Sequence, residues 1–359
     1  MRKLIITEKA NAARRISAIL SDGKSSSASE GGVTVISFDD GKDSYKVVSL
    51  RGHIMELDYS PDYNDWSAVP PADLVYAEQI KTVRVKSILN TLRTVAGESD
   101  EIIIATDYDR EGELIGMETV AALGPFAEKR NGEEVLHYLN GNIPVKRAKF
   151  SALTKGEVEK AFSDLAEPDK RLSDAAETRQ MIDLSWGAVL TRLISISSGQ
   201  VGKNFMSVGR VQSPTLKLLV DRHTEIENFV PVPFWDVIGK FGMLAFRGDH
   251  EKNHFWNKEE ADAVMERLKG ETEGRVEECS VTTKEEYRPA PFDTTQMQVE
   301  ANKIGISPTA AMKLAEDLYT GGYISYPRTE NTEYPRTLNL RSVLEKFKDS
   351  EFGQEAAEI

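Results

Sequence analysis

The stretch that decides the fold is DEIIIATDYDREGELIGMETVAAL, at residues 100–123. An uninterrupted apolar run leads into an acidic turn, and apolar residues at helical spacing follow. The pattern also opens the chain, where RKLIIT at residues 2–7 precedes NAARRISAIL at residues 11–20. Such runs are typical of strands covered on both faces, so two strand-to-helix turns predict a parallel α/β sheet over about residues 1–150. The polar stretch GKSSSASEGG, at residues 23–32, is predicted to be a loop between them.

The rest of the chain predicts helices, then strands, then helices again. Residues 155–222 favour helices with a Ser/Gly-rich interruption, and alternating runs such as FWDVIGKF predict antiparallel strands between residues 234 and 283. A helix pair is expected between residues 294 and 322, and it resembles a helix-turn-helix. YISYPR, at residues 323–328, is expected to form a short strand.

Length and composition indicate a globular protein of more than one domain. The chain has 359 residues, of which 40% are hydrophobic, and this is ample for buried cores. Its single cysteine, Cys279, excludes a disulfide framework within the chain and favours a reducing compartment. Charged residues such as Glu8 and Arg14 interrupt the first apolar segment, so neither a signal peptide nor a membrane span is expected there. A cytoplasmic protein is predicted.

The charge distribution gives two opposite indications about nucleic acid. The net charge of -13 argues against a nucleic-acid partner when it is taken as an average. Between Arg179 and Arg222, however, six basic residues stand against two acidic ones. This local excess is compatible with a basic groove on an acidic body, and equally with an ordinary solvated surface.

Three carboxylates follow the apolar run within residues 100–123. Asp107, Asp109 and Glu111 fall at the carboxyl end of a parallel strand, where open α/β sheets bind ligands. Oxygen ligands of this kind suit Mg2+. Acids at a helix start can instead merely complement the helix dipole. An EF-hand loop would also use these positions together with Gly112 and Glu118, but the preceding segment is a strand and not a helix.

Glu8 and Lys9 end the other apolar strand. They would join the three carboxylates if the two strands are neighbours in the sheet. A cluster of this kind can hold one or two divalent ions that position a phosphodiester. The alternative is that Glu8 only caps the helix that follows.

Tyr326 and Arg328 are two residues apart, so in an extended chain they face the same side. A guanidinium can grip a phosphate while a phenolate attacks it. The phenol needs such help, because its ordinary pKa is about 10. A plain strand end and turn is the competing interpretation. The sequence has no Walker A motif, so nucleotide hydrolysis is not expected, and the five histidines are assigned no metal.

Taken in order, these segments resemble the type IA DNA topoisomerases, nearest to their archaeal and topoisomerase-three-like branch. LIITEKANAARRI at residues 4–16 and ATDYDREGELIG at residues 105–116 look like the motifs of the family's Toprim domain. RQMIDLSWGAVLTR at residues 179–192 and SVGRVQSPTLKLLVDR at residues 207–222 are similar to its helical gate motifs. LYTGGYISYPRTENT, at residues 318–332, resembles the segment that bears the catalytic tyrosine.

The resemblance implies a role for each of the candidate residues. Tyr326 would attack the DNA backbone and become joined to a 5' phosphate, while Arg328 stabilises the developing charge. Glu8 and Lys9 would act at the leaving 3' oxygen. Mg2+ would be held by Glu8, Asp107, Asp109 and Glu111. The groove for the single strand would be lined by Arg179, Asp183, Arg192, Ser207, Arg210 and Gln212.

The resemblance also implies a domain plan and partners. The expected domains are a Toprim domain at 1–150, a helical gate domain at 151–220, a β-rich hinge domain at 221–287 and a helix-turn-helix/winged-helix-like tyrosine domain at 288–359. The expected partner is single-stranded or underwound duplex DNA, bound by a monomer without nucleotide or membrane, and the expected activity is relaxation of negative supercoils. The family fold implied by the resemblance is a ring of four domains. Only 33 residues follow Tyr326, so a fragment with an incomplete ring is expected.

Two other classes of protein compete with this interpretation. A Toprim primase or nuclease would use the same carboxylates without a covalent tyrosine. A non-catalytic helix-turn-helix protein would bind duplex DNA at preferred sequences.

Overall fold

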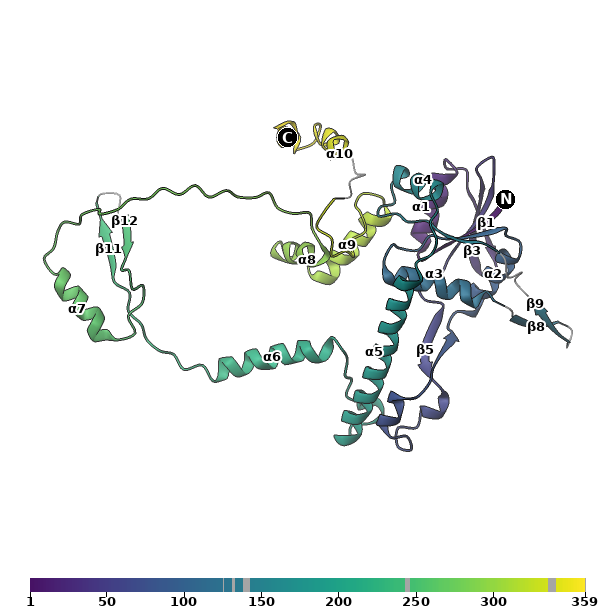
Figure 1. Ribbon diagram of the computed structural model, residues 1–359, viewed down its shortest axis with the longest axis horizontal. Helices are drawn as coiled ribbons and strands as arrows, with labels where there is room; N and C mark the ends of the chain where they lie inside the picture. The colour runs from purple at the N-terminus through teal and green to yellow at the C-terminus, as the bar shows by residue number, and fades with distance from the viewer. Residues whose placement is uncertain (125, 131–132, 138–142, 243–245, 335–339, 359) are drawn as a thin grey trace. The chain divides into compact units, whose positions relative to one another are not determined.

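The computed structural model describes residues 1–124, 126–130, 133–137, 143–242, 246–334 and 340–358. The chain divides into two compact units, and Figure 1 labels their elements. Met1–Arg210 and Ala290–Ile359 form the first unit, and Val211–Pro289 forms the second. The four predicted domains and the three boundaries between them stay predictions.

A six-stranded sheet forms the centre of the first unit, with the order β10-β7-β1-β4-β3-β2. The prediction of a parallel sheet is confirmed for β10, β7, β1 and β4, whereas β3 and β2 add antiparallel pairings at one edge. The loop predicted at residues 23–32 is wrong, because residues 26–30 form the edge strand β2. An edge strand pairs through its backbone, and the side chains of β2 are mostly exposed, so no apolar pattern marks it. The strands are β1 (Arg2–Thr7), β2 (Ser26–Glu30), β3 (Val33–Asp39), β4 (Ser44–Ser49), β7 (Glu101–Ile104) and β10 (Val145–Arg147).

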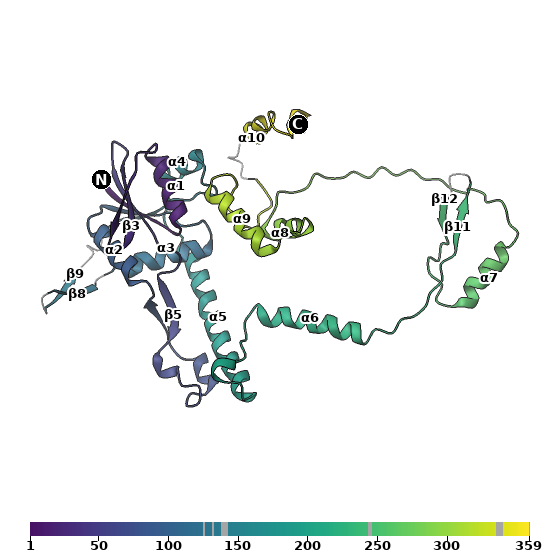
Figure 2. The same cartoon turned by 180° about the vertical axis from the view of Figure 1, so that it is seen from behind.

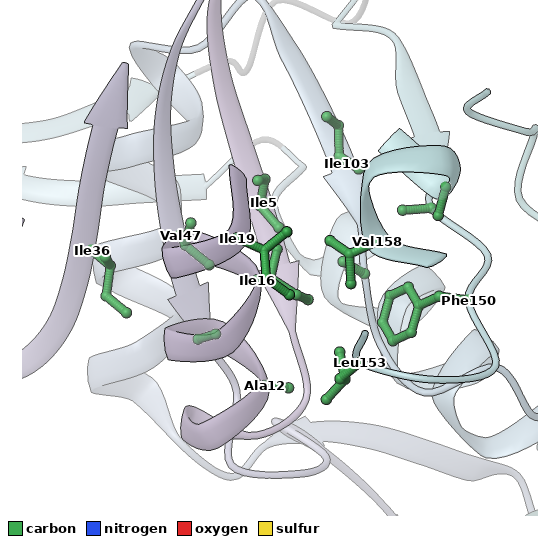
Figure 3. Close-up of a cluster of buried hydrophobic side chains, with 14 of the residues drawn as sticks. Ile5, Ala12, Ile16, Ile19, Ile36, Val47, Ile103, Phe150, Leu153 and Val158 are labelled. Atoms are coloured by element: carbon green, nitrogen blue, oxygen red, sulfur yellow. The ribbon is translucent and has the colours of Figure 1, made fainter. Parts of the chain in front are cut away.

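Helices cover both faces of this sheet, which explains why residues 4–6 of β1 and residues 102–104 of β7 form continuous apolar runs. On one face, Ile5 packs with residues of α1 (Ala10–Leu20) and α4 (Lys155–Ser163), as Figure 3 shows. On the other face, Leu4 and Ile6 pack with residues of α2 (Lys86–Gly97) and α3 (Arg110–Ala122). Figure 2 gives the reverse view of these layers. The helix predicted at residues 11–20 is confirmed as α1.

A long helix, α5 (Lys170–Ser197), packs against α3 and contacts a hairpin formed by β5 (Met55–Tyr59) and β6 (Gln79–Val83). Tyr59 Oη and Gln79 Nε2 lie 3.1 and 2.8 Å from Ser185 Oγ on this helix. The remaining elements of this region are η1 (Pro61–Tyr63), η2 (Pro71–Val75), η3 (Gly202–Asn204) and the hairpin of β8 (Phe126–Arg130) with β9 (Glu133–His137).

The predicted helix pair is confirmed as α8 (Thr294–Lys303) and α9 (Pro308–Thr320). The Ser307 side chain accepts from Ala310 N at 3.3 Å and caps α9. The short strand predicted at residues 323–328 is wrong. Tyr326 N–H donates to Ser151 O at 2.8 Å, but the next residue, Pro327, has no N–H with which to extend a ladder. The helices α10 (Leu340–Phe347) and α11 (Gly353–Glu358) follow.

The second unit contains α6 (Gln212–Glu227), a hairpin of β11 (Ile238–Phe241) with β12 (Phe246–Asp249), and α7 (Lys258–Leu268). The antiparallel strands predicted between residues 234 and 283 are confirmed only for this hairpin. The later part is helical, because Asn257 caps α7 and the spacing of Ala261 and Val264 buries one helix face. Residues 271–290, which include Cys279, are exposed and lack regular secondary structure. Among the described helices, none is long and apolar enough to cross a membrane.

Candidate active site

The turn from β7 to α3 places two of the predicted acids. Asp107 is 3% exposed, and Asp109 caps α3 by accepting from Gly112 N at 2.7 Å. A β-carbon at Gly112 would lie 2.2 Å from Asp107 O, so only glycine allows this turn to close against the helix. The glycine after Glu111 is therefore a structural requirement for the position of Asp107.

Lys9 reaches this turn from the neighbouring strand. β1 and β7 are adjacent and parallel, so the condition for bringing Glu8 and Lys9 to the acids is met. Lys9 Nζ donates to Asp107 Oδ2 at 2.7 Å and also to Glu316 on α9, and it lies 3.8 Å from Glu8 Oε1. Burial alone would lower the pKa of Lys9, but the surrounding carboxylates outweigh it and raise that pKa. The lysine is held as a cation.

The cluster nevertheless carries excess negative charge. Burial raises the pKa of Glu8 to about 7, and the charges of Asp107, Asp109 and Glu316 add to this effect against the opposing charge of Lys9. Burial also raises the pKa of Asp107, although the Lys9 ammonium opposes it. One ammonium therefore does not neutralise the group, and a further cation would be stabilised there.

The tyrosine segment closes over the same acids. Tyr326 Oη donates to Asp109 Oδ2 at 2.5 Å, and Tyr319 Oη on α9 donates to Asp107 Oδ1 at 3.2 Å. The two rings contact edge to face at 5.2 Å. Burial raises the pKa of Tyr326, and its bond to the Asp109 carboxylate raises it further. The phenol is thus a neutral donor in this state. Arg328 is exposed and makes no hydrogen bond or ion pair with any described residue.

Glu111 belongs to a different set of contacts. Its carboxylate lies 2.6 Å from His53 Nε2 and 3.4 Å from Gln180 Nε2 on α5. His53 Nδ1 lies 3.2 Å from Glu118, and this bond is the main cause that raises the pKa of His53. Within the described ranges, no group of three or more His, Cys, Asp or Glu side chains is arranged to hold a metal ion. The four predicted metal ligands are therefore not gathered into one preformed set.

Comparison with known proteins identifies the family. Residues 3–151 match the Toprim domain, and residues 167–359, more than half of the chain, match the family described as DNA topoisomerase. The chain belongs to the type IA DNA topoisomerases. This membership decides against the primase, nuclease and helix-turn-helix interpretations.

Individual topoisomerases support the assignment. The chain is 42% identical to DNA topoisomerase 1 of Thermoplasma acidophilum over 99% of its own length and 44% of that protein. It is 44% identical to DNA topoisomerase 1 of Archaeoglobus fulgidus, over 98% of the chain and 50% of that protein. Human DNA topoisomerase 3-beta-1 is 33% identical over 95% of the chain and 41% of the human protein. The chain thus spans about half the length of the curated relatives it matches.

A solved topoisomerase structure shares the fold. Full-length topoisomerase I from Thermotoga maritima superposes with a TM-score of 0.66 at 24% identity, and the match covers 98% of this chain and 53% of that one. The likeness extends over nearly the whole chain, so the Toprim domain and the helical topoisomerase part are both represented in this fold.

Three residues that contact the acidic turn or Lys9 were not predicted from the sequence. Glu316 and Tyr319 lie one helical turn apart on α9 and both face the acids, a spacing that could have pointed to them. Arg147 is fully buried, pairs with Glu113 at 2.7 Å and donates to Asp107 O at 2.9 Å. An arginine in a strand of the sheet was the available signal for this third residue.

The six predicted groove residues differ in their exposure and in the contacts that they make. Arg210 grips Asp183 with two bonds of 2.6 and 3.1 Å, and Arg179 lies 3.8 Å from the same carboxylate. Arg192 lies nine residues beyond Asp183 in α5. An α-helix has about 3.6 residues per turn, so the two side chains lie on opposite sides of the helix. Arg192 is 7% exposed, donates to Tyr63 O and covers the ring of Trp66. Ser207 is exposed in the first unit, and Gln212 is exposed at the start of α6 in the second.

Proposed function

We propose that this chain carries the cleavage centre of a type IA topoisomerase, which cuts one DNA strand and rejoins it through Tyr326. The observation that carries the proposal is the 2.5 Å bond between Tyr326 Oη and Asp109 Oδ2, which joins residues 217 positions apart. Tyr319 makes a similar contact with Asp107 but is fully buried, whereas Tyr326 is only partly buried, so Tyr326 is the tyrosine that a DNA phosphate can reach. The bond to Asp109 supports the placement of the nucleophile beside the Toprim acids.

The residues have complementary roles in the cut. The phenol gives its proton to the carboxylate it already contacts, and its oxygen attacks the phosphorus while the bond to the 3' oxygen breaks. Glu8, with a pKa of about 7, can hold a proton for that departing oxygen at neutral pH. The Lys9 ammonium and the Arg328 guanidinium stabilise the charge on the phosphate. Attack by the 3' hydroxyl on the phosphotyrosine reverses these steps, so ATP is not needed.

Mg2+ fits the donor set by charge and by chemistry. Carboxylate oxygens are its preferred ligands, and the raised pKa values of Glu8 and Asp107 show that the cluster favours added positive charge. Glu8, Asp107, Asp109 and Glu111 would hold the ion once Asp109 has released Tyr326 and Glu111 has released His53, because the described carboxylates are not gathered into one set. Bound there, Mg2+ supplies charge neutralisation at the phosphate.

The substrate proposed is single-stranded DNA, or duplex DNA that is underwound enough to expose one strand. Arg179 lies on the exposed side of α5, and Arg210 follows that helix in the chain. Both supply basic contacts for the strand, and Asp183 orients their guanidinium groups. The enzyme is proposed to act as a monomer in the cytoplasm and to relax negative supercoils.

A covalent-adduct assay tests the proposal. The full chain is mixed with single-stranded DNA labelled at its 3' end, denatured, and examined for labelled protein. Wild type and Tyr323→Phe should form the adduct, because Tyr323 is 80% exposed and outside the cluster, whereas Tyr326→Phe should form none. Label retained in Tyr326→Phe, or absent from the wild-type chain, would overturn the proposal.

A further inference from the structure

A cavity in the first unit is lined by none of the residues assigned to the cleavage chemistry above. It has a volume of about 330 Å³, within the range of ligand pockets. It lies between the first turns of α1 and strands β2, β3 and β4. We call it the arginine cleft, and its polar lining is Arg14, Ser25, Ser26, Ser27, Thr34, Ser49 and Arg51.

The arginine cleft is basic although the chain is acidic. The sequence has 58 acidic and 45 basic residues, yet none of the described residues that line the cleft is acidic. The Arg51 guanidinium makes no hydrogen bond or ion pair within the described part of the chain. Arg14 donates to the neutral Asn11 side chain, so its charge is also uncompensated. Arginines with hydroxyl groups are the side chains that bind backbone phosphates in nucleic acids.

Its position ties the cleft to the cleavage centre. Arg51 N–H donates to Glu8 O at 2.9 Å, and Ala10, which also lines the cleft, directly follows Lys9. Arg51 has a φ of +61°, a left-handed conformation that is costly for a residue other than glycine. Such strain at a non-glycine residue is a feature of functional positions.

The cleft and the predicted DNA groove lie on opposite sides of the sheet. α1 covers one face, whereas α5 packs on α3 at the other. A strand that follows α5 and crosses the carboxylates would therefore continue toward α1. Resting on the proposed function, we propose that the arginine cleft binds a backbone phosphate of the DNA strand beyond the scissile phosphate, on the side away from α5.

The salt dependence of DNA binding tests this site. Fluorescence anisotropy with a single-stranded oligonucleotide would compare wild type, the double variant Arg14→Gln/Arg51→Gln, and Arg84→Gln, an exposed arginine of the same unit outside the cleft. For a single strand, losing one phosphate contact lowers the slope of log K against log salt by about 0.7. The double variant should lose at least about this much, and the Arg84→Gln control should keep the wild-type slope.

The length of the oligonucleotide gives a second readout. When the oligonucleotide is shortened stepwise from either end, the difference in salt slope between wild type and the double variant should disappear for shortening from one end only. An unchanged slope in the double variant, or an equal loss in the control, would overturn the proposal. The adduct assay keeps this result separate from the cleavage function. If the double variant forms the adduct and its salt slope equals that of wild type, the cleft proposal alone is refuted. If the double variant has a lower salt slope but the wild-type chain forms no adduct, the cleavage function alone is refuted.

Discussion

At the scale of single residues, the site combines side chains whose charges are set by burial and by neighbouring carboxylates. Tyr326 is kept protonated and Lys9 is kept charged, while Glu8 lies near its midpoint at neutral pH. A phenol, an ammonium and a carboxyl group are thus each held in a useful protonation state. These states depend on one another, because the Asp107 carboxylate is among the causes of all three pKa shifts.

Glu8 should make stability depend on pH. Its pKa is about 7 in the folded chain against an ordinary value of 4.5, so the folded state binds the proton more tightly. The resulting stability is complete below about pH 4.5 and is lost as the pH rises through about 7. Urea unfolding at pH 5 and pH 7.5 should show a smaller loss for Glu8→Gln than for wild type. Glu330→Gln, an exposed glutamate of the same unit, should behave as wild type, and equal losses in all three proteins would contradict the prediction.

Arg147 should be a large contributor to stability. Both it and Glu113 are fully buried, so Arg147→Met leaves an unpaired buried carboxylate and should cost about 3–5 kcal/mol of unfolding free energy. Lys155→Met removes one partner of an ion pair with Asp22 that is exposed at both ends and should change little. Chemical denaturation of both variants measures the difference. A similar small effect in both would show that Glu113 finds another partner.

At the scale of elements, the turn between β7 and α3 depends on close packing. Gly112→Ala would force its new methyl group against Asp107 O and should cost roughly 1–3 kcal/mol. Gly156→Ala in α4 meets nothing within 4 Å and should be neutral or stabilising by up to about 1 kcal/mol. Thermal unfolding of the two variants checks the contrast. Equal effects would mean that the turn can relax around a β-carbon.

The sequence predicted the elements whose side chains reveal their surroundings. β1, β7, α1 and α9 carry apolar patterns or caps that match the observed burial, and α8 was also predicted although none of its residues is buried. β2 could not be predicted in this way, because its partner is chosen by backbone pairing and its side chains face water. The segment around Tyr326 read as a strand since its residues favour one, but it has a single backbone bond to Ser151.

The candidate site was predictable to a similar extent. The strand ends gave Glu8, Lys9, Asp107 and Asp109, because neighbouring parallel strands end at one edge of a sheet. The direction of a side chain was not predictable, and Glu111 therefore joins His53 instead of the other acids. The spacing of Glu316 and Tyr319 shows that they share a face of α9, but which residues that face contacts depends on how α9 docks.

At the scale of the whole molecule, the first unit is assembled from two stretches of chain separated by the second unit. Trypsin should cut first within residues 271–290, which are exposed, lack regular structure and contain the cleavable Arg275 and Lys284. The carboxyl-terminal fragment should nevertheless elute with the rest in gel filtration, because Tyr319 and Tyr326 attach it to the Toprim acids. Separate elution would show that these contacts do not hold the fragment without the connecting chain.

The same exposed stretch contains the chain's sole thiol, Cys279. A maleimide fluorophore would therefore attach at one defined point of the natural sequence, without prior removal of other cysteines. Paired with a second dye on the 3' end of an oligonucleotide, it would report by energy transfer when DNA arrives and when it leaves. The distribution of one amino acid thus makes the protein ready for single-molecule optical study.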